Sequence, residues 1–297
     1  MLSSFRSLVL FAACTATLAC SSVTENVVAD SGGSSSSGGN AGAGVGGAPN
    51  GGAPNGGAPN GGAPNGGAPD GGAPNDAATD PCASTQGPKM VAVDGYCVDG
   101  TEVSRADYAA FLAAKPKPPV TGECSFKPSY TPSCESPGTD PALPVVCVDV
   151  CDAEAYCAFA GKRLCGRIGG GNVASGFGDP AVSQWFNACS QGGTRVYPYG
   201  KSYAAKACNG YDFGAGAPVS VGVMSGCVGG FDGIFDMSGN VREWEEACDA
   251  SQGPDDVCRN RGGSFTLIDK DYLGCASAFS AKRSTRDPTI GFRCCRD

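Results

Sequence analysis

The stretch Gly233-Ile-Phe-Asp-Met-Ser-Gly-Asn-Val-Arg-Glu-Trp244 decides the fold, together with Arg261-Gly-Gly-Ser-Phe265 a short distance downstream. Both stretches are interrupted by glycine and carry no long hydrophobic period, which predicts turns and loops. The motifs that flank them are TEVSRADYAAF (101–111), LPVVCVDVCDAEAYCAFAGKRL (143–164), QWFNAC (184–189), SQGG (190–193), VYPYG (196–200) and IGFRC (290–294).

Two of the flanking motifs predict helices. Ser104 begins a capping box that Asp107 completes, and the next residues on one helical face are Tyr108, Phe111 and Leu112. A second helix is predicted over residues 152–163, with Gly161 near its end. Residues 98–103 predict a short strand. Short helices among many loops predict an α+β domain that is poor in regular structure.

Taken in order, these motifs resemble the formylglycine-generating enzyme (sulfatase-modifying factor) domain family across residues 90–297. Each motif alone occurs by chance, but their order, and the closeness of GNVREW to RGGS, is specific. The resemblance implies the loop-rich fold of this family, which is a variant of the C-type lectin fold. We therefore expect a disulfide-stapled α+β domain.

The family's oxidase uses two cysteines shortly after the RGGS motif to bind copper(I) and activate oxygen, and soft thiolates suit that metal. The corresponding residues 264–274 contain no cysteine. Cys275 stands where the family has a structural disulfide cysteine. The iron-dependent branch of the family needs histidines, and the chain has no His. We therefore expect neither bound copper nor formylglycine generation, and leave open an oxidase with relocated cysteines.

The cysteine count predicts disulfides. Sixteen cysteines lie between Cys82 and Cys295, an even number in a chain that begins like an exported protein. A zinc site is the alternative, but it usually shows paired Cys-x-x-Cys motifs, which are absent. The resemblance implies that Cys157 pairs with Cys294 and Cys189 with Cys275. Against the family pattern, Cys165 comes directly after KRL, and residues 166–182 form an insertion that could remodel or cover the substrate groove.

Calcium is the other chemistry that the resemblance implies. In GNVREW the oxygen ligands would be the Asn240 side chain, the Val241 carbonyl and the Glu243 carboxylate, and hard oxygens are what Ca²⁺ binds. Asn209 and the carbonyl of Gly210 resemble the start of a second calcium loop. The structural alternative is that Asn240 caps a turn while Glu243 pairs with Arg261 or Arg293.

Residues 1–20 predict a lipoprotein signal peptide. Arg6 precedes an apolar run, and Leu18-Ala19-Cys20 resembles the bacterial lipobox, in which the cysteine becomes the lipid-modified N-terminus. An ordinary secretory signal is the alternative. Residues 21–80 come next as a disordered stalk with six GGAPN-type repeats that have no large side chain to pack. We expect residues 81–297 to be displayed on the outer membrane or cell surface.

Composition limits the partners. Residues 81–297 carry 20 basic and 24 acidic side chains, so the domain is mildly acidic and unsuited to nucleic acid. Four tyrosines are candidates for stacking on a glycan or peptide, or for packing the core: Tyr197, Tyr199, Tyr203 and Tyr211. Five carboxylates could serve an acid-base hydrolase, although no pair is specified: Asp232, Asp236, Glu243, Glu245 and Glu246. Our hypothesis is a non-catalytic binding or structural module, with the copper oxidase as the alternative.

Overall fold

The structure is a computed structural model that describes residues 80–84, 86–135 and 138–297, all within one compact unit. The predicted signal peptide, Cys20 and stalk residues 21–79 lie outside the described residues. Of the helices in the described part of the chain, none is both long and apolar enough to cross a membrane.

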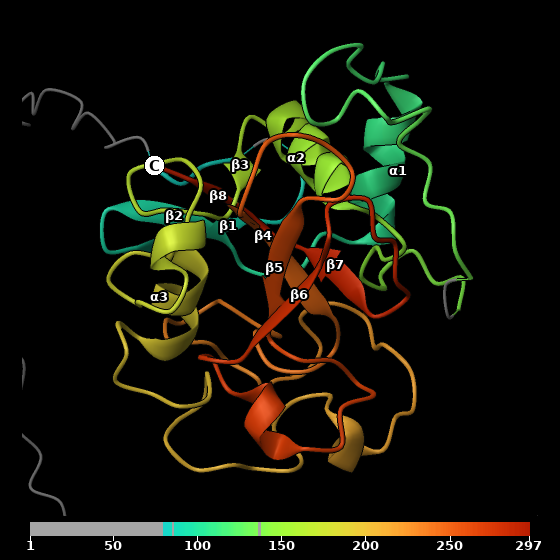
Figure 1. The fold of residues 1–297 in the computed structure, drawn as a ribbon. Coiled ribbons are helices and arrows are strands. Elements are labelled where there is room, and N and C mark those ends of the chain that lie inside the picture. The colour runs from blue at the N-terminus through green and yellow to red at the C-terminus, as the bar shows by residue number, and fades with distance from the viewer. Residues whose placement is uncertain (1–79, 85, 136–137) are drawn as a thin grey trace, which may run out of the picture. The chain divides into compact units, whose positions relative to one another are not determined.

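The domain contains short helices and short strands joined by long loops (Figure 1). The α-helices are α1 (Arg105–Ala113), α2 (Val150–Phe159) and α3 (Gln184–Ser190), and the 3-10 helices are η1 (Ala174–Gly176), η2 (Tyr211–Phe213) and η3 (Lys270–Leu273). The strands are β1 (Met90–Val93), β2 (Tyr96–Asp99), β3 (Arg163–Leu164), β4 (Arg242–Cys248), β5 (Val257–Arg261), β6 (Ala278–Lys282), β7 (Ile290–Phe292) and β8 (Cys294–Arg296). The α+β prediction is confirmed.

The strands form two four-stranded sheets, with the orders β1-β2-β8-β3 and β6-β5-β4-β7. Neighbouring strands are antiparallel except β4 and β7, which are parallel. Arg293 is the one residue between β7 and β8, so the GFRC motif carries the chain directly from one sheet to the other. The GNVREW and RGGS motifs meet in the second sheet, where the backbone of Glu243 on β4 is in register with that of Arg261 on β5.

Helix α1 begins where its cap predicts, whereas α2 begins two residues before the predicted Asp152. Ser104 and Asp107 form the predicted capping box of α1, and Asp149 and Asp152 form a second box that begins α2. The predicted end of α2 was wrong: the helix ends at Phe159, because Gly161 has a φ of +69° and turns the chain away. The strand predicted over residues 98–103 is confirmed only for its start, since β2 ends at Asp99.

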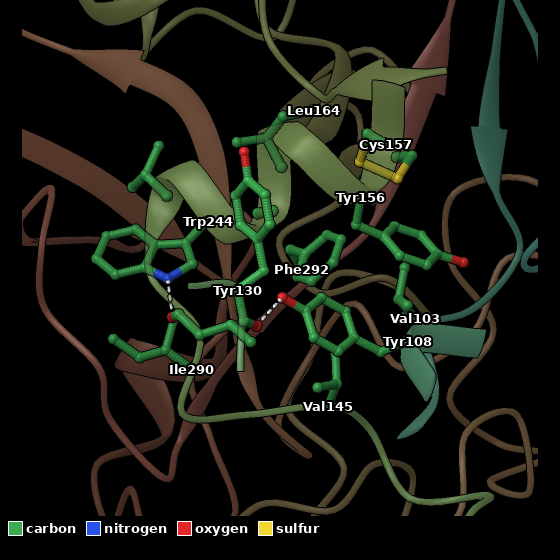
Figure 2. Close-up of a cluster of buried hydrophobic side chains, with 14 of the residues drawn as sticks. Val103, Tyr108, Tyr130, Val145, Tyr156, Cys157, Leu164, Trp244, Ile290 and Phe292 are labelled. Carbon is green, nitrogen blue, oxygen red and sulfur yellow. Dashed lines mark hydrogen bonds between the residues drawn. A yellow bond between two sulfur atoms is a disulfide. The ribbon is translucent and has the colours of Figure 1, made fainter. Parts of the chain in front are cut away.

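An aromatic core joins α1 and α2 to the second sheet (Figure 2). The Tyr108 ring packs against the rings of Phe111 and Tyr156, with centroids 5.3 and 5.8 Å apart. Its hydroxyl donates to the Tyr130 carbonyl at 2.7 Å, and the Trp244 indole donates to the Val148 carbonyl at 3.0 Å. These buried polar atoms of the aromatic side chains are thereby satisfied.

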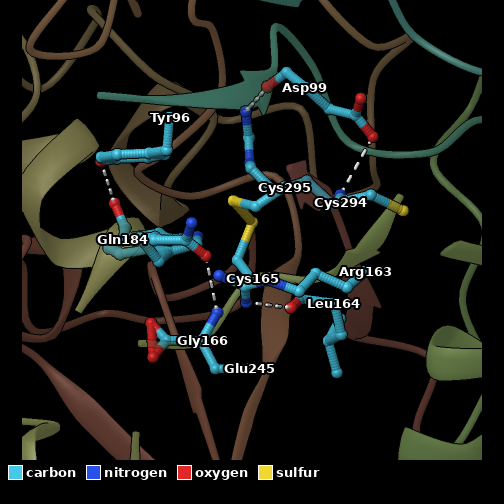
Figure 3. Close-up of a disulfide and its surroundings, with 12 residues drawn as sticks. Tyr96, Asp99, Arg163, Leu164, Cys165, Gly166, Gln184, Glu245, Cys294 and Cys295 are labelled. Carbon is cyan, nitrogen blue, oxygen red and sulfur yellow. Dashed lines mark hydrogen bonds between the residues drawn. A yellow bond between two sulfur atoms is a disulfide. The ribbon is translucent and has the colours of Figure 1, made fainter. Parts of the chain in front are cut away.

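All sixteen cysteines of the described part form disulfides. The pairs are Cys82–Cys97, Cys124–Cys151, Cys134–Cys147, Cys157–Cys294, Cys165–Cys295, Cys189–Cys275, Cys208–Cys227 and Cys248–Cys258. Both pairs that the resemblance implied, Cys157–Cys294 and Cys189–Cys275, are among them. Figure 3 shows Cys165, the departure from the family pattern, bonded to Cys295 next to the main chain of Cys294. The adjacent cysteines of β8 thus have separate partners.

Candidate functional site

The segment after the RGGS motif folds back over its glycines. A Cβ atom on Gly263, whose φ is +69°, would lie 2.7 Å from both the Leu273 side chain and the Tyr272 carbonyl. The Ser238 hydroxyl donates to the Leu273 carbonyl at 2.8 Å and fixes the end of η3. Residues 264–274 thus form a packed turn, in which Leu267 is half-buried and Tyr272 is exposed.

No thiol is available beside this segment among the described residues. The nearest cysteine in sequence, Cys275, is bonded to Cys189 of α3, with their Cα atoms 5.6 Å apart. Because every cysteine between Cys82 and Cys295 is in a disulfide, this part of the chain offers no thiolate to a soft metal ion.

A cleft of about 470 Å³ lies beside the end of η3. Its walls come from the loop after α3 and from the chain around Cys275, and they include Phe186, Arg195, Val196, Tyr197, Asp271 and Ser277. Arg195 donates to the Pro198 carbonyl at 2.7 Å. The cleft therefore combines an apolar and aromatic wall with one basic and one acidic side chain, which suits binding of a polar ligand.

Three of the four candidate tyrosines pack against one another, and of these Tyr197 lines the cleft. The Tyr197 and Tyr199 rings stack with centroids 5.6 Å apart and an interplanar angle of 6°, and the Tyr203 ring lies 5.6 Å from Tyr197. Tyr203 donates to Asp212 at 3.0 Å. Burial raises the pKa of Tyr197 above its ordinary value. Of the four, only Tyr211 projects into solvent, with 55% of its surface exposed.

The insertion 166–182 packs against the arginine of the RGGS motif. The Arg261 guanidinium lies over the Phe177 ring at 3.6 Å and over the Phe186 ring at 4.8 Å. It also pairs with Glu245 at 3.0 Å. None of the described residues that line the cleft comes from residues 166–182. Among the described residues, the insertion therefore forms no wall of this cleft, although it packs behind it against Arg261.

The structure brings the two predicted calcium loops together into one cluster. Asn209 donates its side-chain amide to Asn240 Oδ1 at 3.1 Å, and its carbonyl accepts from the Asn240 backbone at 2.8 Å. Asn240 Oδ1 also accepts from the Val219 backbone at 2.9 Å. The Gly210 carbonyl accepts from the Phe213 backbone at 3.1 Å.

The Glu243 carboxylate next to this cluster is occupied by hydrogen-bond donors in this structure. Arg293 donates Nε to its Oε2 at 2.6 Å and Nη2 to its Oε1 at 2.7 Å, and the Trp185 indole donates to Oε2 at 2.7 Å. Both carboxylate oxygens are thus committed to donors. Glu243 therefore pairs with Arg293 rather than with Arg261, and calcium at Asn240, Val241 and Glu243 stays a prediction.

Two carboxylates beside the cluster could not be placed from the sequence. Glu102 Oε1 accepts from Asn240 Nδ2 at 3.0 Å, and Asp236 Oδ2 accepts from the Gly222 backbone at 2.6 Å. Glu102 belongs to the motif that was interpreted as a strand, and Asp236 was one of five candidate acid-base carboxylates. The position of Glu102 beside Asn240 depends on a contact between residues 138 apart in sequence, which no local pattern reveals.

Comparisons with known proteins identify the family of this domain. A model of the sulfatase-modifying factor enzyme 1-like domain matches residues 61–297. The chain belongs to this family. Formylglycine-generating enzyme of Mus musculus is 26% identical over 277 residues, covering 70% of this chain and 68% of the relative. The Bos taurus enzyme of that name is 24% identical over 274 residues, covering 70% of this chain and 67% of the relative.

Solved structures with a similar arrangement include PvdO from Pseudomonas aeruginosa, with a TM-score of 0.49 and 20% identity, covering 68% of this chain and 80% of that chain. CarF has a TM-score of 0.45 and 20% identity, covering 68% of this chain and 85% of that chain. In the present domain, residues 264–274 after the RGGS motif contain no cysteine.

Proposed function

We propose that this member of the family is a non-catalytic binding or structural module, displayed on a lipid-anchored stalk. The observation that carries the proposal is the state of its cysteines: residues 264–274 contain none, and the sixteen between Cys82 and Cys295 pair with one another. Copper(I) chemistry of the family's type requires two thiolates that converge on one metal ion. Neither Leu267 nor Tyr272 carries a sulfur ligand for such a metal ion.

The cleft between Tyr197 and Asp271 is the proposed ligand site. Its mixture of aromatic wall, guanidinium and carboxylate matches a peptide or a glycan, which bury apolar faces while their polar groups pair. A disulfide joins both sides of the cleft: Cys275 lies between the lining residues Gly274 and Ala276, and it is bonded to Cys189 of α3, the helix that carries Phe186. A preorganised wall of this kind lowers the entropy lost on binding.

The anchored display is proposed from the sequence. Cys20 would carry the lipid, and acyl chains contribute ~0.8 kcal/mol per buried CH₂. The GGAPN-type stalk would hold the domain away from the bilayer by a typical distance of roughly 40–45 Å. A ligand-binding domain on such a tether can search the space around the membrane that carries it.

A thiol count and an oxidation assay test the proposal together. The full chain, denatured without reductant, should show no reactive thiol from residues 81–297, and sixteen after reduction. Loaded with copper(I), it should leave a sulfatase-type cysteine peptide unoxidised, while a catalytically active formylglycine-generating enzyme converts the same peptide. Two free thiols in the native chain, or turnover of the peptide, would favour the alternative of a copper oxidase with relocated cysteines.

A further inference from the structure

The side chain of Lys127 is enclosed inside the domain, between two carboxylates. It is 1% exposed, and the side chains of Asp149 and Asp152, at the start of α2, are 2% and 0% exposed. Lys127 Nζ lies 2.5 Å from Asp149 Oδ2 and 2.5 Å from Asp152 Oδ1. The Tyr130 ring lies on another side, with its centroid 6.0 Å from Nζ. A lysine amine that is held away from water is a nucleophile once a neighbouring group takes its proton.

The two contacts of the Lys127 amine differ in kind. Nζ donates a hydrogen bond to Asp149 Oδ2. Asp152 Oδ1 has no hydrogen-bond partner among the described residues, although Nζ lies 2.5 Å from it. The amine therefore approaches the Asp152 carboxyl group without the alignment of a hydrogen bond. Such a close approach places the nitrogen where it can add to the carboxyl carbon, while Asp149 is placed to take the proton of the amine.

The other oxygen of Asp152 is held by two donors. Asp152 Oδ2 accepts from the backbone N–H of Asp149 at 2.9 Å and from Arg286 Nη2 at 2.9 Å, and Arg286 Nε also donates to Asp149 Oδ2 at 3.2 Å. Two donors at this distance stabilise the negative charge that develops on a carboxyl oxygen when an amine adds to its carbon. Burial, reinforced by the charge of Asp149, raises the pKa of Asp152 to about 6. Part of the Asp152 population therefore carries the proton that a departing oxygen needs.

The chain that carries Lys127 is fastened on both sides. Cys124 is bonded to Cys151 of α2, and Cys134 is bonded to Cys147, which precedes that helix. The backbone N–H of Lys127 donates to the Cys124 carbonyl at 3.2 Å. The amine and the carboxyl group thus lose little freedom when they react, and fixed neighbours of this kind react with effective concentrations of roughly 10⁵–10⁸ M.

We propose that Lys127 and Asp152 form an isopeptide bond, with Asp149 as the base. The bond that forms joins Nζ to Cγ of Asp152, and the bond that breaks is Cγ–Oδ1. Starting from protonated Asp152, the oxygen leaves as water with the proton of the carboxyl group and one proton of the Lys127 ammonium. The second ammonium proton stays on Asp149. The condensation requires no oxidant and no cofactor.

The product fits the surroundings of the present ion pair. Asp152 Oδ2 becomes the amide oxygen and keeps its donors from Asp149 and Arg286, so the cap of α2 is retained. A buried charged pair is replaced by a neutral amide, which removes the cost of keeping two ions out of water. Unlike the neighbouring Cys124–Cys151 disulfide, this link between the loop and α2 is not cleaved by a reductant.

A second buried lysine pair provides an internal control. Lys162 Nζ lies 2.6 Å from Asp99 Oδ1, and both side chains are fully buried. Nζ also donates to the Pro88 carbonyl at 2.9 Å. Among the described residues, no second carboxylate lies within ion-pair distance of Lys162, so this pair has no base beside it. We expect Lys162 and Asp99 to remain an ion pair.

Mass spectrometry of the full chain tests the bond. After reduction and alkylation, a protease that cuts after glutamate releases residues 124–135, which contain Lys127, and residues 136–154, which contain Asp152. We expect them as one branched peptide that is lighter than the sum of the two linear peptides by one water molecule. The segments of Lys162 and Asp99 should stay separate.

Two variants test the roles of the groups. Lys127→Arg should give only linear peptides, because a guanidinium keeps the charge but remains protonated and does not attack a carboxyl group. Asp149→Asn should lower the cross-linked fraction of freshly expressed chain at least ~10-fold, because it removes the base. Asparagine still caps a helix, so α2 should begin at the same place in this variant.

Three outcomes would overturn the proposal. One is a wild-type chain that gives the two linear peptides at full mass, which would mean that Lys127 forms an ion pair only; this result does not depend on how the variants fold. Another is an Asp149→Asn chain that is cross-linked as completely as the wild type. The third is a cross-link between Lys162 and Asp99, which would mean that burial alone, without a second carboxylate, drives the condensation.

Discussion

The guanidinium of Arg261 lies over the ring of Phe177, with 3.6 Å between Cζ and the ring centroid. Arg261 is fully buried, and its remaining donors reach Glu245 and the carbonyls of Cys275 and Ser277. Phe177 belongs to the insertion that distinguishes this chain from the family pattern. The insertion therefore supplies one wall of the pocket that holds the arginine of the RGGS motif.

Phe177→Ala should lower the free energy of unfolding by about 3 kcal/mol, because it leaves a cavity and uncovers the buried guanidinium. Urea unfolding of the variant and the wild type measures the difference. Phe213→Ala is the matched control, since the Phe213 ring faces the exposed Lys206 at 5.9 Å. A loss as large in Phe213→Ala as in Phe177→Ala would contradict the role of the insertion.

The free energy of unfolding should fall as pH rises above 4.5, because of the buried carboxyl group of Glu245. Burial raises its pKa from 4.5 to about 7, despite the neighbouring Arg261. The folded chain therefore binds a proton more tightly than the unfolded chain, so this contribution is complete below pH 4.5 and is lost as pH rises through about 7. One proton corresponds to a slope of about 1.4 kcal/mol per pH unit.

Glu245→Gln should flatten that slope between pH 5 and 7, measured as the urea midpoint at each pH. The change in slope is the diagnostic quantity, since the variant also alters the partner of Arg261. Asp255→Asn serves as control, because Asp255 lies in a solvated pair with Lys282. Equal slopes in the wild type and Glu245→Gln would show that Glu245 stays ionised throughout this range.

The sequence predicted those features that depend on local patterns. The capping box at Ser104 and the disulfide-stapled α+β class can be derived from short stretches and from the cysteine count. Helix α3 was missed because all seven of its residues are buried, which removes the alternation of polar and apolar positions that marks a helix. In the second sheet, the parallel pairing of β4 with β7 joins residues far apart in the sequence, such as Glu243 and Gly291, and no short pattern encodes it.

The candidate site was predictable in its residues but not in its pairings. Asn240 and Asn209 were selected separately, and only the fold shows their side chains 3.1 Å apart. The partner of Glu243 could have been either Arg261 or Arg293. The side-chain contacts decide it: Arg293 donates to both oxygens of Glu243, whereas Arg261, although in register with Glu243 on β5, pairs with Glu245. The position of Glu102 beside Asn240 is likewise a property of tertiary packing.

Cys20 should carry the lipid that anchors the chain. Cleavage before Cys20 would leave this residue as the N-terminus, and mass spectrometry of the mature protein should show an acylated cysteine. In detergent phase partitioning, the Cys20→Ser variant should be found in the aqueous phase, because the acyl chains that supply the membrane affinity would be missing. An unmodified N-terminus, or unchanged partitioning of the variant, would refute the anchor.

The disulfides of Cys294 and Cys295 should contribute to stability in a strongly non-additive way. They close loops of 137 and 130 residues to Cys157 and Cys165, each worth about 5 kcal/mol if it acted alone. With one bond intact, opening the other frees a loop of only about ten residues, which corresponds to about 2.5–3 kcal/mol.

The double-alanine variants Cys157→Ala/Cys294→Ala and Cys165→Ala/Cys295→Ala should each lose that smaller amount. Because the intact Cys189–Cys275 bond shortens the loop that the last of these bonds closes to about 50 residues, the quadruple variant should lose about 1.5 kcal/mol more than their sum, measured by denaturant unfolding in a double-mutant cycle. Additive losses would mean that each bond acts through native contacts rather than by restricting the unfolded chain.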